Sequence, residues 1–250
     1  MKNNLQPHIR IGNEHQVKYA LLPGDPGRVE EVAKFLDQPE VAAYNREYKT
    51  IIGSYKGVRV MVTSTGIGGV STGIAVEELK NIGVKVMIRI GSSGALQSNL
   101  QLGDLVIASG AVRNDGASYA YINKAYPAIP DTDLLFHVIN AAKGTGAKSH
   151  IGLVRSHDSF YTDKEQELDR YWSEKGILAS DMETAALFVI GRLRGIKTAS
   201  VLNVVVEKEG DLERGINEYV DKKAASVGEE KEILTALEAV VSFADFLKNE

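Results

Sequence analysis

The sequence contains no cysteine among its 250 residues. A chain without thiols depends on no disulfide and has no thiolate metal site. It also lacks an apolar run of membrane-spanning length, because stretches such as Lys85–Ile90 and Val201–Val206 are far shorter than the roughly 20 residues that a spanning helix needs. These absences exclude a small disulfide-stabilised domain and predict that the protein does not enter membranes.

An excess of one charge is absent as well. The 29 Lys and Arg residues nearly balance the 33 Asp and Glu residues, for a formal net charge of -4. This balance argues against broad binding to nucleic acids or anionic membranes, although it allows a local basic pocket. The first residues, Met1–Asn4, are polar and do not form a charged and then apolar signal region. We therefore expect a cytoplasmic protein without nucleic-acid or membrane partners.

Two nucleotide-binding motifs are missing. No glycine-rich turn ends in the Gly-Lys-Ser/Thr of a P-loop, and none has the complete dinucleotide fingerprint with its ribose-binding acid. Nucleotide hydrolysis and hydride transfer are therefore disfavoured. The chain has no internal repeat, low-complexity tract or linker, and its composition is that of an ordinary globular protein. We expect a single domain over residues 1–250.

Short β-branched runs alternate with helical patterns along the chain. The runs that predict strands are Tyr19–Leu22, Val58–Thr63, Val84–Ile90, Leu105–Ala108, Ile151–Val154 and Ala199–Val206. The patterns that predict helices are Gly27–Leu36, Thr72–Ile82, Asp131–Gly144, Asp163–Lys175, Met182–Leu193 and Ala224–Leu247. The polar stretch Glu207–Leu212 is expected to be a loop. The alternation predicts an α/β fold in which helices cover a mostly parallel, twisted central sheet.

Three strand ends carry glycine-rich turns. In Pro23–Arg28, glycines let backbone amides approach an anion and an arginine opens a helix, although an ordinary turn with a surface arginine fits equally well. Arg89–Gly94 places an arginine in an apolar run, which indicates either a buried ion pair or a charge-assisted oxyanion site. Ser64–Gly69 gives weaker support. Together the turns favour free phosphate as the ligand.

Two later segments have residues suited to a sugar and a base. In Asp181–Thr184, Glu183 is able to accept sugar hydroxyls, or else it complements a helix dipole. His157–Tyr161 resembles a binding loop whose aromatic rings stack on a planar base, although the same rings suit core packing.

Taken in order, these segments resemble the nucleoside phosphorylase family, which contains bacterial uridine phosphorylase and the hexameric purine nucleoside phosphorylases. The resemblance spans nearly the whole chain. Its most specific motifs are Gly24–Arg28, Asn45–Tyr48, Ser64–Gly69, Arg89–Gly94 and Met182–Glu183. The resemblance implies a pentosyltransferase without an organic cofactor. Inorganic phosphate, the co-substrate, would attack the anomeric carbon of a nucleoside and release the base and ribose 1-phosphate.

The same resemblance implies roles for individual residues. Phosphate ligands would be Gly24, Arg28, Arg89 and Ser92, with Arg46 from a neighbouring subunit. Ribose ligands would be Met182, Glu183 and His8, which reaches across a dimer interface unless it is simply a solvated terminal histidine. The catalytic residues would be Arg89, Glu183 and Lys208. These roles imply a homo-oligomer, namely a dimer with shared active sites inside a ring-shaped hexamer.

Some relatives hold a monovalent cation such as K+, which here would lie near Glu47, Ile67 and Ser71. No other metal is expected.

The base is less clearly indicated. Ser109–Pro127 and Ile74–Leu79 look more like uridine phosphorylase, with Phe160 and Gln166 as the base ligands. However, Leu168 stands where that family has an arginine, and the longer insert typical of the family is missing.

Some features of the sequence argue against a purine enzyme and others favour one. Lys208 falls where bacterial purine enzymes use an aspartate, whereas Tyr44–Tyr48 and Ile190–Leu202 are similar to protozoan purine enzymes. Uridine is therefore the expected nucleoside and a purine nucleoside is the alternative. A nucleosidase and a non-catalytic nucleoside sensor are further alternatives on the same fold.

Overall fold

The computed structural model describes residues 5–208, 210 and 223–248. Its strands are β1 (Tyr19–Pro23), β2 (Asp37–Asn45), β3 (Tyr48–Tyr55), β4 (Val58–Thr63), β5 (Val86–Ala95), β6 (Leu105–Asn114), β7 (Ser149–His157), β8 (Ala179–Asp181) and β9 (Lys197–Val206). Its helices are the 3-10 helix η1 (Asn13–His15) and the α-helices α1 (Pro26–Ala33), α2 (Gly69–Asn81), α3 (Gly116–Tyr121), α4 (Thr132–Gly144), α5 (Glu165–Glu174), α6 (Thr184–Leu193) and α8 (Lys223–Lys248).

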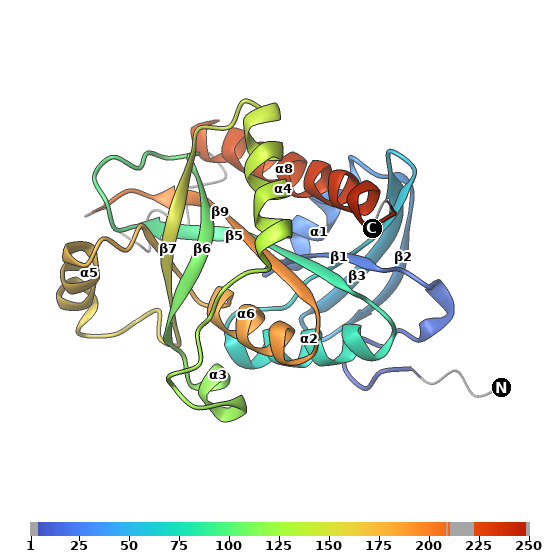
Figure 1. Cartoon of the computed structure of the whole chain (residues 1–250), viewed down its shortest axis with the longest axis horizontal. Helices are drawn as coiled ribbons and strands as arrows, with labels where there is room; N and C mark the ends of the chain where they lie inside the picture. The colour runs from blue at the N-terminus through green and yellow to red at the C-terminus, as the bar shows by residue number, and fades with distance from the viewer. Residues whose placement is uncertain (1–4, 209, 211–222, 249–250) are drawn as a thin grey trace.

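The described strands form one sheet in the order β2-β3-β4-β1-β5-β8-β7-β6-β9. Strands β4, β1, β5 and β9 are parallel neighbours, and β2-β3-β4 is an antiparallel meander at one edge. Because β5 pairs with both β8 and β9, the last five strands close into a ring. Figure 1 shows β6 and β7 of this ring running steeply across the direction of β5.

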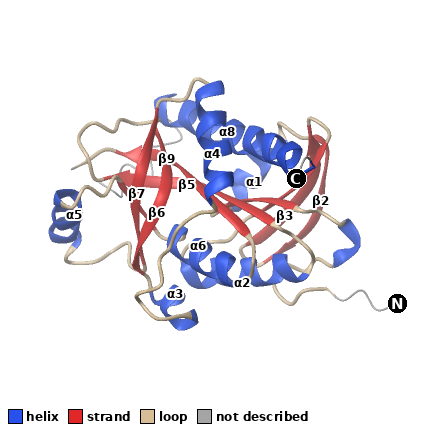
Figure 2. Cartoon of the chain, in the orientation of Figure 1, coloured by secondary structure: helices blue, strands red, loops and turns tan. Residues whose placement is uncertain are grey.

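Helices cover both sides of the sheet, as Figure 2 shows. On one side α2 and α6 pack against each other, and their core includes Leu79 and Phe188. On the other side α1, α4 and α8 cover the sheet, with Phe243 of α8 in their core. Strand β5 is buried on both faces, since Met87 faces the first core and Ile88 faces the second. The predicted α/β fold with a helix-covered central sheet is confirmed.

Each predicted strand and helix is present, but β5 and β6 continue to Ala95 and Asn114, well past their predicted ends, so Arg89–Gly94 is part of β5 and not a turn after it. Five described elements were not predicted, namely η1, β2, β3, β8 and α3. Strand β2 contains Pro39 and is largely exposed, so it lacks the apolar alternation of a buried strand. Its partner β3 was missed with it, β8 has only three residues, and α3 has six. The loop predicted at Glu207–Leu212 lies partly outside the described residues. None of the described helices has the length and apolar content to cross a membrane.

Candidate active site

The predicted phosphate ligands lie on and around the neighbouring parallel strands β1 and β5, toward the carboxyl ends of the strands, where ligands bind in parallel sheets. The loops after β1 and β4 are tied together, because Gly66 N donates to Gly24 O over 2.9 Å. A Cβ atom on Gly24 would lie 3.3 Å from that Gly66 carbonyl, so the close approach favours glycine. Asp25 caps α1 by accepting a hydrogen bond from Gly27 N at 2.8 Å. This cap fixes the first turn of α1, which carries Arg28.

Arg28 is buried and points across the strand ends. Its Nη2 donates to the Ser92 hydroxyl over 3.0 Å, so α1 and β5 bring these two predicted phosphate ligands together. Two carboxylates of α8 lie beyond, with Glu229 Oε2 at 3.4 Å from Nη2 and Glu232 Oε2 at 3.6 Å from Nη1. A solvent-facing surface arginine is therefore the wrong description of Arg28.

Arg89 lies between two carboxylates in the centre of the site. Its Nε donates to Asp181 Oδ2 over 2.9 Å, and its Nη2 lies 2.5 Å from Glu183 Oε2. The guanidinium folds back over Gly91, where a Cβ atom would lie 2.6 Å from Nη2. The buried ion pair considered for Arg89 is present, and its partners are the carboxylates of β8 and the residue that precedes α6.

The charges of this pair depend on each other. Burial raises the pKa of Glu183, and Arg89 only partly opposes that effect. Burial also disfavours the charged form of Arg89, but Glu183 and Asp181 outweigh it and raise the pKa of the guanidinium. A charged Arg89 is therefore held in place without solvent around it.

Asp181 was not predicted as a site residue, yet it organises this centre. Its Oδ1 accepts from the Ser156 hydroxyl at 2.6 Å, and its Oδ2 accepts from the backbone and hydroxyl of Thr184 at 3.0 and 2.6 Å. With Arg89 as a further donor, the carboxylate is well satisfied. Asp181 therefore anchors Arg89, β7 and the start of α6 to one another.

Glu183 links the carboxylate centre to the loop after β4. Its Oε1 accepts from Gly68 N over 2.6 Å, and Gly68 is the residue that precedes α2. The contact with a helix N-terminus considered for Glu183 is thus made with α2 and not with its own helix α6. Met182, the third predicted ribose ligand, is half-buried between Asp181 and Glu183.

His8 and Arg46 lie away from Arg89 within one chain. His8 Nδ1 is 2.6 Å from Glu78 Oε1, and the backbone amides of His8 and Ile9 donate to the same carboxylate. The segment is therefore anchored to α2, and the histidine side chain remains 38% exposed. Arg46 lies exposed in the turn between β2 and β3 with a φ of 56°. The described residues show no contact of either side chain with Arg89 or Glu183.

The predicted base ligands form no cluster with the carboxylate centre. Phe160 is half-buried against Tyr161, with ring centroids 4.9 Å apart, and Gln166 is exposed in the first turn of α5. Lys208 is half-buried two residues after β9. In the described part of the chain, none of the three predicted residues makes a hydrogen bond or ion pair with Arg89 or Glu183.

Arg155 is a buried charge that sequence reasoning missed. It lies on β7, where its Nε donates to Asn114 Oδ1 over 3.2 Å and its Nη1 is 3.7 Å from Asp169 Oδ1 of α5. Burial lowers the pKa of Arg155 and raises the pKa values of Glu165 and Asp169. The sequence feature that could have indicated a buried Arg155 is its position directly after the predicted strand Ile151–Val154. Arg155 therefore ties α5, the helix of Gln166, to the ring.

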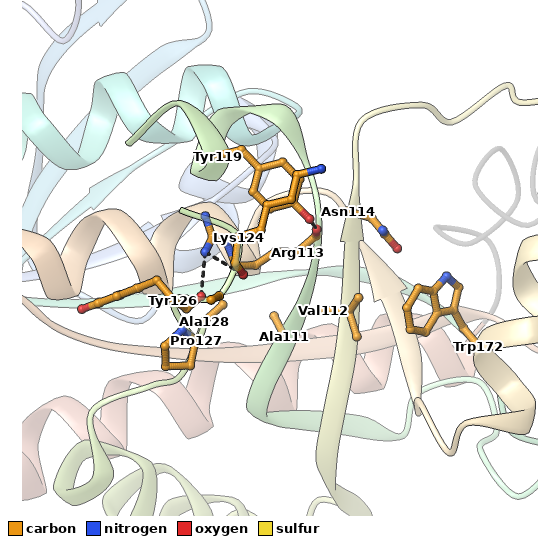
Figure 3. Close-up of a pocket in the computed structure, with 11 residues that line it drawn as sticks. Ala111, Val112, Arg113, Asn114, Tyr119, Lys124, Tyr126, Pro127, Ala128 and Trp172 are labelled. Atoms are coloured by element: carbon orange, nitrogen blue, oxygen red, sulfur yellow. Dashed lines mark hydrogen bonds between the residues drawn. The ribbon is translucent and has the colours of Figure 1, made fainter. Parts of the chain in front are cut away.

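A separate pocket of about 330 Å3 lies beside β6 and contains none of the predicted ligands. Figure 3 shows Arg113 on one side and Trp172 on the other. Arg113 is occupied structurally, because it donates to the carbonyls of Ser118, Ile122, Asn123, Lys124 and Tyr126. In the segment Ser109–Pro127, which resembles uridine phosphorylase, Arg113 therefore stabilises the loop of that same segment.

The three residues predicted near a monovalent cation are neighbours. Ser71 Oγ donates to Ile67 O over 3.1 Å, and a Cβ atom on Gly66 would lie 2.7 Å from Glu47 Cγ and 3.5 Å from Ser71 Oγ. Their oxygen donors suit a hard cation. Among the described residues no cluster of three or more His, Cys, Asp or Glu side chains is placed to bind a metal.

The fold and the site define a class of protein: an α/β protein with buried arginines and carboxylates at the ends of parallel strands, an arrangement suited to an oxyanion beside a polar organic ligand. A family model described as the phosphorylase superfamily matches residues 18–241. The crystal structure of uridine phosphorylase from Vibrio fischeri has a TM-score of 0.90 and 46% identity, covering 97% of this chain and 99% of that chain.

Two relatives are similar to this chain in sequence over most of its length. A uridine phosphorylase from Thermococcus kodakarensis is 37% identical over 257 residues, which cover 98% of this chain and 89% of the relative. A guanosine phosphorylase from Halorubrum lacusprofundi is 38% identical over 218 residues, which cover 86% of this chain and 88% of the relative. The chain belongs to the phosphorylase superfamily. The predicted family and enzyme class, a pentosyltransferase, are confirmed.

Proposed function

We propose that this chain cleaves a ribonucleoside with inorganic phosphate, and that uridine is its preferred substrate. The observation that carries the proposal is the convergence of Arg28, Ser92, Arg89 and Glu183 at one edge of the sheet. Two buried guanidinium groups beside a hydroxyl suit the tetrahedral phosphate anion. A carboxylate next to them suits the hydroxyls of a sugar.

The mechanism assigns each group a part. Arg28, Arg89, Ser92 and the backbone at Gly24 align phosphate with the anomeric carbon, and the partner subunit's Arg46 completes the anion site. Glu183 and Met182 hold the ribose, and the partner's His8 binds its 5′-hydroxyl. As the bond to the base breaks, positive charge grows on the sugar and negative charge grows on the base.

The base site accounts for the remaining predicted residues. Phe160 stacks on the base, and the amide of Gln166 meets the O2 and N3–H of uracil. Lys208 stabilises the departing base. Because Gln166 is exposed on α5, this contact requires α5 to close over the bound base.

We predict that kcat/KM for uridine exceeds that for inosine by about tenfold or more, as expected when a specific amide contact strengthens in the transition state. The measurement is phosphorolysis of each nucleoside at saturating phosphate. Gln166→Ala should lower kcat more than it raises KM for uridine, and Glu167→Ala on the same helix serves as the control. A higher kcat/KM for inosine would establish a purine nucleoside as the substrate, in line with the guanosine phosphorylase relative.

Phosphate dependence separates the proposed reaction from two alternatives. A nucleosidase releases base with water alone and gives free ribose, whereas phosphorolysis needs phosphate and gives ribose 1-phosphate. A non-catalytic sensor releases no base under either condition. Product analysis with and without phosphate therefore distinguishes all three.

We predict that active sites are shared between subunits. Glu183→Gln disables a subunit's own site, and Arg46→Ala disables the site of its neighbour, so each variant alone should have little activity. Mixed dimers contain one intact site, and random mixing in equal amounts should restore about a quarter of wild-type activity. Activity is measured after dissociation and reassembly of the two variants. An active monomer in sedimentation-coupled assays would contradict the shared site.

The proposal also covers the domain organisation, location, cofactor requirement and assembly of the protein. The chain forms a single domain over residues 1–250, works in the cytoplasm without an organic cofactor, and assembles as a dimer within a ring-shaped hexamer. A monovalent cation such as K+ binds near Glu47, Ile67 and Ser71. The neighbouring oxygen donors of these three residues support that site.

A further inference from the structure

Glu232 on the C-terminal helix α8 is a fully buried carboxylate that touches two parts of the site. Its Oε1 accepts a hydrogen bond from Gly91 N of β5 over 2.6 Å. Its Oε2 lies 3.6 Å from Nη1 of Arg28 on α1. Helix α8 therefore covers the sheet and also contributes a charged group beside Arg28.

The sheet leaves room for this carboxylate. Strand β1 accompanies β5 as far as Ile90, and β8 pairs with β5 from Gly94 onward, so Gly91–Ser93 have neither strand beside them. Glu232 supplies the acceptor for the Gly91 amide at this interruption, next to Ser92. A side chain that holds the backbone of β5 here also holds the hydroxyl that contacts Arg28.

The charged groups around Glu232 come from three elements. Arg28 approaches from α1, Arg89 from β5, and Glu229 from the preceding turn of α8. Glu229 borders a cleft of about 570 Å3 between α1 and α8, whereas Glu232 lies behind it without solvent contact. The two carboxylates thus face the same guanidinium from an open side and a closed side.

Burial raises the pKa of Glu232 to about 8, although Arg28 and the Gly91 amide favour its charged form. Glu232 therefore gains or loses its proton around this pH. A carboxylate fixed beside Arg28 would repel a phosphate dianion that takes the same guanidinium, because both are negative. A neutral carboxylic acid in the same place would not.

We propose that Glu232 is a positioning residue of the phosphate site, which contacts Arg28 when the site is empty and is present as the neutral acid when phosphate is bound. This role rests on the proposed function, because it requires phosphate to bind at Arg28. The neutral acid still accepts the hydrogen bond from Gly91 through its carbonyl oxygen. With Glu232 neutral, β5 stays in place when phosphate binds, and no negative charge on Glu232 competes with phosphate for Arg28.

The sign of the pH effect follows from this linkage. Below a pH of about 8 Glu232 is already protonated in the free enzyme, so phosphate binding needs no proton there. Above that pH the proton must be taken up, and the dissociation constant for phosphate rises by up to about tenfold per pH unit. The rise ends where Glu232 ionises in the complex as well.

The test is isothermal titration calorimetry with inorganic phosphate on the full-length oligomer, across a pH series centred on about 8. Wild-type protein should lose affinity above this pH. Glu232→Gln keeps an acceptor for the Gly91 amide but carries no charge, so its phosphate affinity should stay flat over the same range. Glu229→Gln removes the carboxylate on the open side of Arg28 and should keep the wild-type slope.

Each outcome decides a different point. The same slope in wild type and Glu232→Gln would overturn the positioning role but not the proposed function. A wild-type protein that binds no phosphate would overturn both. If Glu232→Gln does not fold, carboxyl NMR of the wild type replaces it, and the titration of Glu232 should move to higher pH when phosphate is added. An unmoved titration would overturn the role.

Discussion

Replacing Arg89 by alanine should lower kcat/KM for phosphate by about 10³-fold, the upper range for losing one preorganised donor in a water-excluded site. The contact is charge-assisted, and burial prevents water from substituting for it. Steady-state kinetics at varied phosphate measure the effect. Arg194→Ala is the matched control, because Arg194 pairs with Glu77 on the surface of α2. Unchanged phosphate dependence would refute the assignment of Arg89.

The same substitution should also destabilise the fold. Without Arg89, the carboxylates of Asp181 and Glu183 are buried next to each other and lack their shared cation. Breaking a buried pair in this way costs about 3–5 kcal/mol in the free energy of unfolding. Adding Asp181→Asn removes one of the two stranded charges and should restore part of that stability without restoring activity. Recovery of both together would mean that Arg89 acts only as a structural ion pair.

Glu183→Gln should lower kcat by about 10²-fold while KM for phosphate changes much less. The glutamine oxygen can still accept from Gly68 N, so the loop before α2 stays in place. The amide cannot provide the charge that stabilises a cationic sugar, and its NH2 group faces a donor of Arg89.

Single-turnover measurements separate the loss in chemistry from any loss in binding. Glu77→Gln removes a surface carboxylate from α2 and is expected to leave kcat unchanged. A drop confined to nucleoside binding would place Glu183 outside the catalytic step.

Where its signals are local, the sequence indicated which side chains lie near one another. Gly24 and Arg28 follow the apolar strand β1 directly, and Arg89 and Ser92 lie on the neighbouring strand β5, so all four lie near one another in the sheet. Arg89 also stood out because an arginine in an apolar run needs a partner. The structure supplies that partner from a residue 92 positions away.

Residues whose role depends on distant parts of the chain could not be predicted in the same way. Glu232 meets Gly91 across 141 positions, and nothing in the pattern of a surface-covering helix marks it as buried. The ring formed by β5 to β9 arises from long-range pairing that includes the three-residue strand β8. Short elements of this kind carry too few residues for a recognisable period.

The segment Ser109–Pro127 shows how a motif can resemble that of a relative for structural reasons. Arg113 and Asp115 contributed to the resemblance of Ser109–Pro127, yet Arg113 binds backbone carbonyls and Asp115 caps α3. Such contacts preserve a loop whatever base is bound. Under the proposed function, the choice of base would depend on Phe160, Gln166 and their surroundings, where the chain departs from the uridine pattern.

The position of β5 in both the open sheet and the closed ring has a consequence for hydrogen exchange. Its amides between Val86 and Ile90 have strands on both sides and apolar cores on both faces, so they should exchange only through global unfolding. Helix α5 has no fully buried residue and should open far more often. The proposed phosphate ligand Arg89 thus lies in the slowest-exchanging part of the protein, and the proposed base ligand Gln166 lies on a fast-exchanging helix. Nucleosides would enter and leave through the side that opens without disturbing the phosphate.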